Sequence, residues 1–198
     1  MNKQELELTQ KEIQRHFTAI MELLGLNLEN ESLKETPKRI AKMYVQELFR
    51  GLHEKPPRIM TVNNDDAAIK YNQMLVERDI KVQSVCEHHF VPIIGVAHVA
   101  YIPDKKVIGL SKINRVVDYF CRRPQVQERL TENIHEFLCK ALGTKDVAVI
   151  VDARHYCVIM RGIKDVNSST VTSKMGGVFE EAEARKELLS LIKMKTYE

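Results

Sequence analysis

The chain has 198 residues, of which 44% are hydrophobic and 29% are charged, and its formal net charge is +3. This length supports one good hydrophobic core, and so small a charge does not by itself indicate a nucleic-acid-binding protein. No apolar run approaches the roughly 18 residues of a membrane span. The charged N-terminus lacks a signal-peptide core, so we expect a cytoplasmic protein with reduced cysteines and without nucleic-acid or membrane partners.

Two helices are predicted within the first fifty residues. Apolar side chains recur at helical spacing up to Leu24, and Gly25 is expected to end the first helix. The segment TPKRIAKMYVQELFRG predicts a second helix with Thr36 as its N-cap and Gly51 at its end. The next segment contains two prolines and an Asn/Asp cluster, which are typical of a linker. We therefore divide the chain into a helical region over 1–55, a linker over 56–75 and a main domain over 76–198.

Beyond the linker the apolar pattern changes to the alternation of β-strands. RDIKVQSV places Ile80 and Val82 on one face, and FVPIIGVAHVAYIP is a long β-rich run in which Gly95 suggests a β-bulge. Two helices follow: SKINRVVDYF, which Ser111 can cap, and PQVQERLTENIHEFLCKAL, with Pro124 near its start. VAVIVDA and HYCVIMRG then predict strands, and residues 179–195 predict a final helix. Because strands and helices do not alternate strictly, we expect an α+β domain with a mainly antiparallel sheet.

The stretch SVCEHHF combines a cysteine with two adjacent histidines. Cys86 and His89 have C-x-x-H spacing, which lets a thiolate and an imidazole converge on one metal ion. Cys157 is the best third ligand, because it lies two residues after a further histidine on a predicted strand and shares a face with it. Cys121 and Cys139 lie among apolar helix residues and are predicted to be core side chains. Three protein ligands with an open fourth position are typical of a catalytic zinc site.

The residues alone leave other interpretations open. Adjacent histidines can be a solvated strand end, with Cys157 in the core, and Cys86 with a histidine can be a nucleophilic pair. A structural zinc module that binds a partner is a third possibility, but it would need a fourth ligand and a compact Cys/His arrangement. His88 is not expected to bind the ion beside His89 if the backbone there is extended, because neighbouring side chains then point to opposite faces.

Five motifs carry a resemblance to a known family: ETPKRIAKMY, SVCEHHFVPIIG, VIGLSKINR, RRPQVQERLTENI and HYCVIMRGI. In this order along nearly the whole chain, they resemble zinc-dependent GTP cyclohydrolase I. The resemblance implies the tunnelling fold, with helices on one face of a mainly antiparallel sheet, assembled as a homodecamer that shares active sites between subunits. It also implies conversion of GTP to 7,8-dihydroneopterin triphosphate with release of formate, the first step of folate and pterin biosynthesis. A tunnelling-fold relative with other chemistry, such as a nitrile reductase with a cysteine nucleophile, is the alternative.

The resemblance further implies roles for individual residues. Zinc, one ion per subunit, is bound by Cys86, His89 and Cys157, and the catalytic histidines are His88 and His155. Guanine is recognised by Gln127 and Glu128; a carboxylate can accept from both N1–H and the exocyclic amine of guanine, a pair of donors that adenine does not offer. The triphosphate contacts are Ser111, Lys112, Arg115 and Arg161, with Arg39 from a neighbouring subunit. On the predicted strand, Arg161 would lie roughly 13 Å beyond Cys157.

Overall fold

The computed structural model describes residues 1–66 and 70–194 of the chain. Part of the predicted linker, residues 67–69, and residue 195 of the predicted final helix lie outside the described residues. The chain forms two compact units, Met1–Lys55 and Pro56–Glu198. No helix in the described ranges is both long enough and apolar enough to cross a bilayer.

The N-terminal unit is a pair of helices. α1 (Lys3–Leu23) begins with a capping box between Asn2 and Glu5, and Gly25, just past the end of the helix, has a φ of +74°. α2 (Thr36–Met43) has Glu35 rather than the predicted Thr36 as its N-cap, because Thr36 is already the first residue of the helix. The predicted single helix up to Gly51 is divided, since a π-helical turn (Tyr44–Leu48) and a 3-10 turn (Arg50–Leu52) follow α2.

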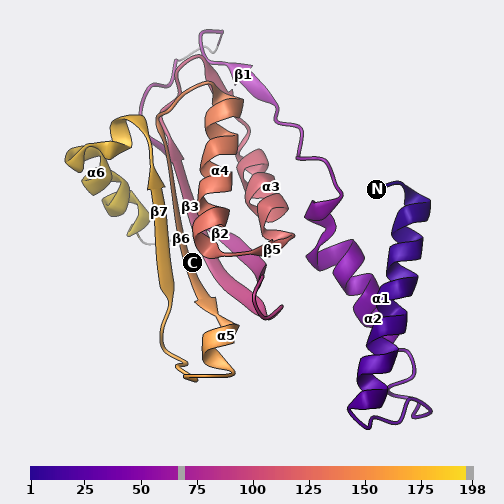
Figure 1. Ribbon diagram of the computed structural model, residues 1–198. Helices are drawn as coiled ribbons and strands as arrows, with labels where there is room; N and C mark the ends of the chain where they lie inside the picture. Colours follow the sequence, from indigo (N-terminus) through magenta and orange to yellow (C-terminus); the bar gives the residue numbers. More distant parts are fainter. Residues whose placement is uncertain (67–69, 195–198) are drawn as a thin grey trace. The chain divides into compact units, whose positions relative to one another are not determined.

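The second unit is built on a five-stranded sheet of order β5-β2-β3-β6-β7, in which all pairs are antiparallel except the short β2–β5 pair. A separate two-stranded sheet pairs β1 with β4. Figure 1 shows α3 and α4 packed side by side against the large sheet. The strands are β1 (Thr61–Asn63), β2 (Leu75–Cys86), β3 (Pro92–Tyr101), β4 (Lys106–Ile108), β5 (Pro124–Gln125), β6 (Val147–His155) and β7 (Thr170–Met175). The helices are α3 (Leu110–Cys121), α4 (Gln127–Leu142), α5 (Tyr156–Ile159) and α6 (Ala182–Ile192), with a 3-10 turn at Gly177–Glu180.

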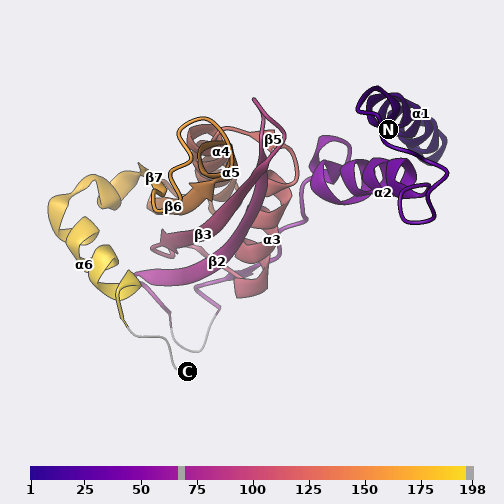
Figure 2. The same ribbon diagram turned by 90° about the horizontal axis from the view of Figure 1, so that it is seen from below.

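Alternate residues of the strands supply two apolar clusters on opposite faces of the sheet. Val149 and Val151 of β6 belong to the main core, to which α3 and α4 contribute their apolar faces. Ile150, between them, packs with Phe179 and Leu188 from the C-terminal segment on the opposite face. Figure 2 shows the sheet from below with α3 and α6 apart from one another. The predicted α+β architecture of the tunnelling fold is therefore confirmed, and α6 adds cover at one end of the second face.

Gly95 sits at a close approach of two strands and not at a bulge as predicted. It pairs in regular register with Val82 of β2 and Ala153 of β6. A Cβ atom added at Gly95 would lie 2.1 Å from the carbonyl oxygen of Asp152 and 2.5 Å from the Cα of Ala153. The register shift lies instead in β2, between Glu77 and Ile80. Glycine is therefore needed at position 95 because there is no space for a side chain.

Gly95→Ala should destabilise the second unit by about 1–3 kcal/mol, because the added methyl group forces β3 and β6 apart. Gly109→Ala is the matched control, since the nearest atom to a Cβ added there is the Lys112 Cγ at 3.7 Å. Thermal unfolding followed by circular dichroism, at equal protein concentration, should give a midpoint several degrees lower for the first variant than for the second. Equal midpoints would show that the strands accommodate the methyl group.

Candidate metal and nucleotide site

The loop between β2 and β3 is a tight turn that begins at Cys86. The Cys86 N–H donates to the carbonyl of Val91 at 2.8 Å, and the Phe90 N–H donates to the carbonyl of Cys86 at 2.9 Å. The backbone over 87–89 is a turn and is not extended, so the condition under which His88 and His89 were expected to point to opposite faces is not met. The Nδ1 atoms of the two imidazoles lie 3.9 and 4.0 Å from the Cys86 Sγ.

The junction of β6 and α5 lies at the same edge of the sheet. β6 ends at His155, which pairs with Ile93, and the prediction that HYCVIMRG continues as a strand is wrong. One physical reason lies across the sheet: the next residue of β3 is Pro92, which has no N–H to donate to a longer β6. Cys157 therefore lies in the first turn of a helix, and Arg161 follows that helix closely instead of lying far along a strand.

These two segments bring the three predicted zinc ligands together. The ligand atoms of Cys86, His89 and Cys157 all lie within 4.8 Å of one another. A tetrahedral zinc ion with bonds of about 2.0–2.3 Å separates neighbouring ligand atoms by roughly 3.5–4 Å, so the group needs only a small contraction to bind the ion. Cys121 is 1% exposed, and burial raises the pKa of its thiol to about 12, which fits its predicted place in the core.

The electrostatics of this group also fit a cation. Burial, together with the neighbouring Cys86 thiol, raises the pKa of Cys157 above its ordinary value. Two thiolates this close repel one another, and a divalent cation between them removes that penalty. The guanidinium of Arg161 donates to the Nε2 of His89 at 2.9 Å, so Nδ1 is the nitrogen that faces Cys86. Two sulfurs and one imidazole nitrogen are a donor set that suits zinc.

The first turn of α4 approaches the same edge of the sheet. The predicted helix start near Pro124 is wrong, because Pro124 and Gln125 pair with the end of β2 as the short parallel strand β5. The helix starts at Gln127, which is buried and accepts a hydrogen bond from the Nε2 of His155 at 2.7 Å. Burial lowers the pKa of His155, an effect that the negative charge of Glu128 partly opposes. Glu128 itself is exposed.

The predicted phosphate contacts on α3 lie at the other end of β2. Gly109, not Ser111, is the N-cap of α3, because the helix starts one residue before Ser111. Asn114 donates to the Glu77 carboxylate at 3.0 Å, whereas the carbonyl of Cys121 accepts from Ser84 at 2.9 Å. The helix thus runs beside β2 with its C-terminal end nearest the metal ligands.

A rise of 1.5 Å per residue places Lys112 about 14 Å along the helix from its last residue. The structure therefore does not bring Ser111, Lys112 or Arg115 to the metal ligands of their own chain. Arg39 is exposed on α2 of the N-terminal unit.

An ion pair near the ligands was not foreseen from the sequence. The Glu87 carboxylate forms an ion pair with Arg129 of α4, and its other oxygen lies 3.8 Å from the Nε2 of His88. Arg129 also donates to the side chain of Gln125 at 3.1 Å. Glu87 lies in the CEHH motif and Arg129 in the QERL motif, but a periodic pattern in the sequence does not predict contacts between positions so far apart. The pair ties the loop that carries the histidines to the start of α4.

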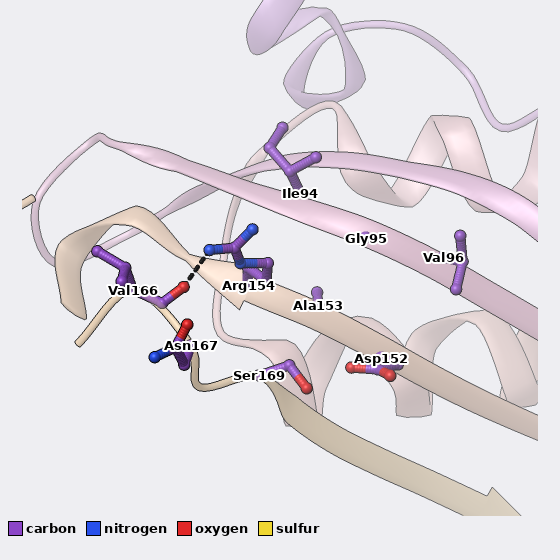
Figure 3. Close-up of a pocket in the computed structure, with 9 residues that line it drawn as sticks. All are labelled: Ile94, Gly95, Val96, Asp152, Ala153, Arg154, Val166, Asn167 and Ser169. Carbon is purple, nitrogen blue, oxygen red and sulfur yellow. Dashed lines mark hydrogen bonds between the residues drawn. The ribbon is translucent and has the colours of Figure 1, made fainter. Parts of the chain in front are cut away.

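A separate pocket lies on the sheet face opposite α3 and α4 (Figure 3). Its floor is formed by β3 and β6, and the loop before β7 supplies one wall. Arg154 donates to the carbonyl of Val166 across this pocket. None of the predicted site residues lines it. The pocket is therefore distinct from the candidate metal site.

An α+β sheet with a possible Cys–His–Cys metal site at the ends of two strands fits a metal-dependent enzyme, and comparison with known proteins identifies the family. The family model described as GTP cyclohydrolase I matches residues 13–193. A "GTP cyclohydrolase 1" of Flavobacterium johnsoniae is 52% identical over 94% of this chain and 82% of the relative. Those of Haemophilus ducreyi (54% identical, 94% and 88%) and Yersinia enterocolitica (51% identical, 98% and 88%) are similarly close. The chain belongs to the GTP cyclohydrolase I family of enzymes. This membership argues against the nitrile reductase and the structural zinc module.

Cys86→Ser and Cys157→Ser should each lose bound zinc, because a three-ligand site loses a thiolate that the ion needs. Cys139→Ser is the matched control: Cys139 is half-buried in α4, outside the ligand group, and its variant should keep the metal. Elemental analysis of the purified proteins gives the zinc content per chain. Retention of one zinc per chain by both ligand variants would contradict the assignment.

Proposed function

We propose that this protein catalyses the zinc-dependent conversion of GTP to 7,8-dihydroneopterin triphosphate, with release of formate, as the first step of folate and pterin biosynthesis in the cytoplasm. The observation that carries the proposal is the convergence of Cys86, His89 and Cys157 beside His88, in a chain that belongs to this family. The reaction requires addition of water to C8 of guanine, opening of the imidazole ring and loss of C8 as formate.

Zinc is the proposed cofactor, one ion per subunit, with Cys86, His89 and Cys157 as its protein ligands. When bound, it supplies a Lewis acid at an open fourth position, where water has a pKa near ~7 instead of ~16. A His89 that gives the lone pair of Nδ1 to the metal carries its proton on Nε2. It then no longer accepts from Arg161, which leaves that guanidinium available to an anion.

The two remaining histidines are proposed to move protons. His155 is half-buried, and the lowered pKa favours its neutral form, which suits a general base. The side chain of His88 is 64% exposed, with its Nε2 3.8 Å from a Glu87 carboxylate oxygen, so it can reach a substrate bound beside this loop. We therefore assign proton acceptance to His155 and proton donation to His88, at the purine nitrogens or the ribose oxygen.

Recognition of the base is assigned to the first turn of α4. The carboxylate of Glu128 is exposed and is near enough to His155 to influence its pKa, so it can face a purine held beside that imidazole. It can accept hydrogen bonds from both N1–H and the exocyclic amine of guanine. The predicted contact of the Gln127 side chain with guanine would have to displace the hydrogen bonds that this buried amide makes inside the protein.

The triphosphate is assigned to Ser111, Lys112, Arg115 and Arg161, with Arg39 from a neighbour. Arg161 already lies beside His89, but the α3 residues lie toward the other end of β2 from the metal ligands. Lys112 and Arg115 are separated by one helical turn and can bind one anion together. We propose that these two residues serve the active site of an adjacent subunit, as proposed for Arg39.

Such sharing requires a homo-oligomer, and we propose that the assembly is the homodecameric ring that the family resemblance implies. In the described part of the chain, the outer edge of β7 has no partner strand, and the outer edge of β2 pairs only at Val85 and Cys86. Unpaired edges are sites where a further strand can add, and a closed ring of subunits leaves none of them exposed. Val171 of the edge strand β7, 62% exposed, adds apolar surface at one of these edges.

Zinc-loaded protein incubated with GTP should release formate and form a pterin product in equal amounts, measured by a formate assay and by the fluorescence of the oxidised pterin. His88→Ala and His155→Ala should keep their zinc and lose turnover by roughly 10²–10⁴-fold, because each removes a general acid or base. His16→Ala, on an exposed position of α1, is the matched control and should turn over normally. No formate from the unmodified protein would refute the proposed function, and metal loss in a histidine variant would make that histidine a ligand.

Sharing of the site between subunits predicts complementation. Lys112→Ala and Cys157→Ser should each be nearly inactive alone, because one weakens the triphosphate contacts and the other loses the metal. Unfolding the two variants together and reassembling them should create some sites with an intact zinc centre and an intact lysine. The mixture should then exceed the summed activity of the separately reassembled variants. A mixture that does not, with subunit exchange verified by mass spectrometry, would show that Lys112 serves its own chain.

A further inference from the structure

We propose that Gln127 is a positioning residue that fixes which nitrogen of His155 carries the proton, and that its side chain does not read guanine. The proposal rests on the proposed function in that it assigns His155 to the reaction. Gln127 is the first residue of α4 and is 1% exposed, and His155 is the last residue of β6. A hydrogen bond of 2.7 Å joins the Gln127 Oε1 to the His155 Nε2.

The orientation of the Gln127 amide is determined by its other partners. Its Nε2 carries two hydrogens and lies within hydrogen-bond distance of three acceptors: the carbonyl oxygens of Val151 and Thr170, at 3.0 and 2.7 Å, and the Thr172 hydroxyl at 3.2 Å. The reversed amide would place Oε1 against two backbone carbonyl oxygens, all of which are acceptors only. The amide nitrogen therefore faces β6 and β7, and the amide oxygen faces His155.

Two threonine hydroxyls are consistent with this orientation, which the two backbone carbonyl groups already determine. The Thr131 hydroxyl donates to the backbone carbonyl of Gln127 at 2.8 Å and lies 2.6 Å from the Thr172 hydroxyl. Each hydroxyl has one proton. Because Thr131 uses its proton on the carbonyl, Thr172 must donate to Thr131, and it is then free to accept from the Gln127 amide. The donors and acceptors form a consistent network across α4 and β7.

The consequence concerns the tautomer of His155. Since the Gln127 Oε1 carries no hydrogen, the His155 Nε2 must be the protonated nitrogen of the neutral imidazole. Nδ1 then holds the free lone pair, and it is the nitrogen through which His155 exchanges protons with substrate. Without Gln127 the imidazole could adopt either tautomer and turn about its side-chain bonds. Guanine recognition is left to Glu128, because both donors of the Gln127 amide are engaged within the protein.

Gln127→Leu tests the proposal by removing the amide while keeping most of its volume. We expect kcat for GTP to fall on the order of 10–100-fold, as for other groups that orient a functional histidine, with KM changed less than about threefold. Thr172→Val is the matched control, because it removes one acceptor of the amide and leaves Oε1 and both carbonyl partners in place. It should keep kcat within about threefold.

Nitrogen-15 NMR of histidine-labelled, zinc-loaded protein, recorded in the solid state so that assembly size is unimportant, provides a readout independent of turnover. His155→Asn identifies the resonances of His155 by their absence. We expect neutral His155 to carry its proton on Nε2 in the unmodified protein and in Thr172→Val, and to be a mixture of tautomers in Gln127→Leu.

Two results would overturn the proposal. One is a proton on Nδ1 in the unmodified protein, which decides the question even if Gln127→Leu does not fold. The other is a Gln127→Leu enzyme with normal kcat, a raised KM and weakened preference for GTP over ATP, as expected of a base-reading residue. If the unmodified protein released no formate from GTP, the proposed function would fail, whereas the spectra would still decide the tautomer.

Discussion

The antiparallel register of β2, β3 and β6 is the constraint on which the candidate site depends. Pairing of Val85 with Pro92 and of Ile93 with His155 places the end of β2 and the end of β6 at one edge of the sheet. A slip of one residue would turn every side chain of a strand to the opposite face. The lack of a side chain at Gly95 permits the close approach of β3 and β6 that this register requires.

Polar contacts then hold the segments of the candidate site together at these strand ends. The Glu87–Arg129 pair joins the histidine loop to α4, and β5 joins the start of α4 to the end of β2. An isolated surface ion pair contributes little to stability, about 0–1 kcal/mol. Here the ion pair matters for the position of the loop, because His88 lies in the same turn as Glu87. The buried amide of Gln127 plays a similar part for His155 from the other side of the site.

Periodicity in the sequence was sufficient to predict the helices and strands whose conformation is determined by nearby residues. The alternation through Ile80 and Val82 correctly predicts β2, and the apolar spacing correctly predicts the bodies of α3 and α4. Element ends were less predictable, because they depend on partners far along the chain. β6 stops at His155, just before the position that would lie opposite Pro92 of β3, and Pro124 joins β2 as a strand although proline commonly starts helices.

The candidate site shows the same division between local and distant information. C-x-x-H spacing and the chemistry of thiolates were sufficient to nominate Cys86, His89 and Cys157, which the fold brings together. No local pattern in the sequence distinguishes Gln127 from the exposed Glu128 beside it. Both were expected to bind guanine, although the amide of Gln127 makes its hydrogen bonds inside the protein. The different environments of the two side chains depend on β6 and β7, whose backbone carbonyl groups accept hydrogen bonds from the amide of Gln127.

The register that assembles the metal ligands also limits what one chain can bind. Because α3 lies along β2 with its C-terminal end toward Cys86, its first turn is directed toward the other end of the strand. The lysine and arginine there are held away from Cys86 by the packing of the helix, because Ile113 and Val116 are fully buried in the core. Moving these two side chains into water would cost about 1.5–3 kcal/mol each. An adjacent subunit could present the same cations without that cost, and the packing of α3 is therefore one argument for the proposed completion of the site by a neighbour.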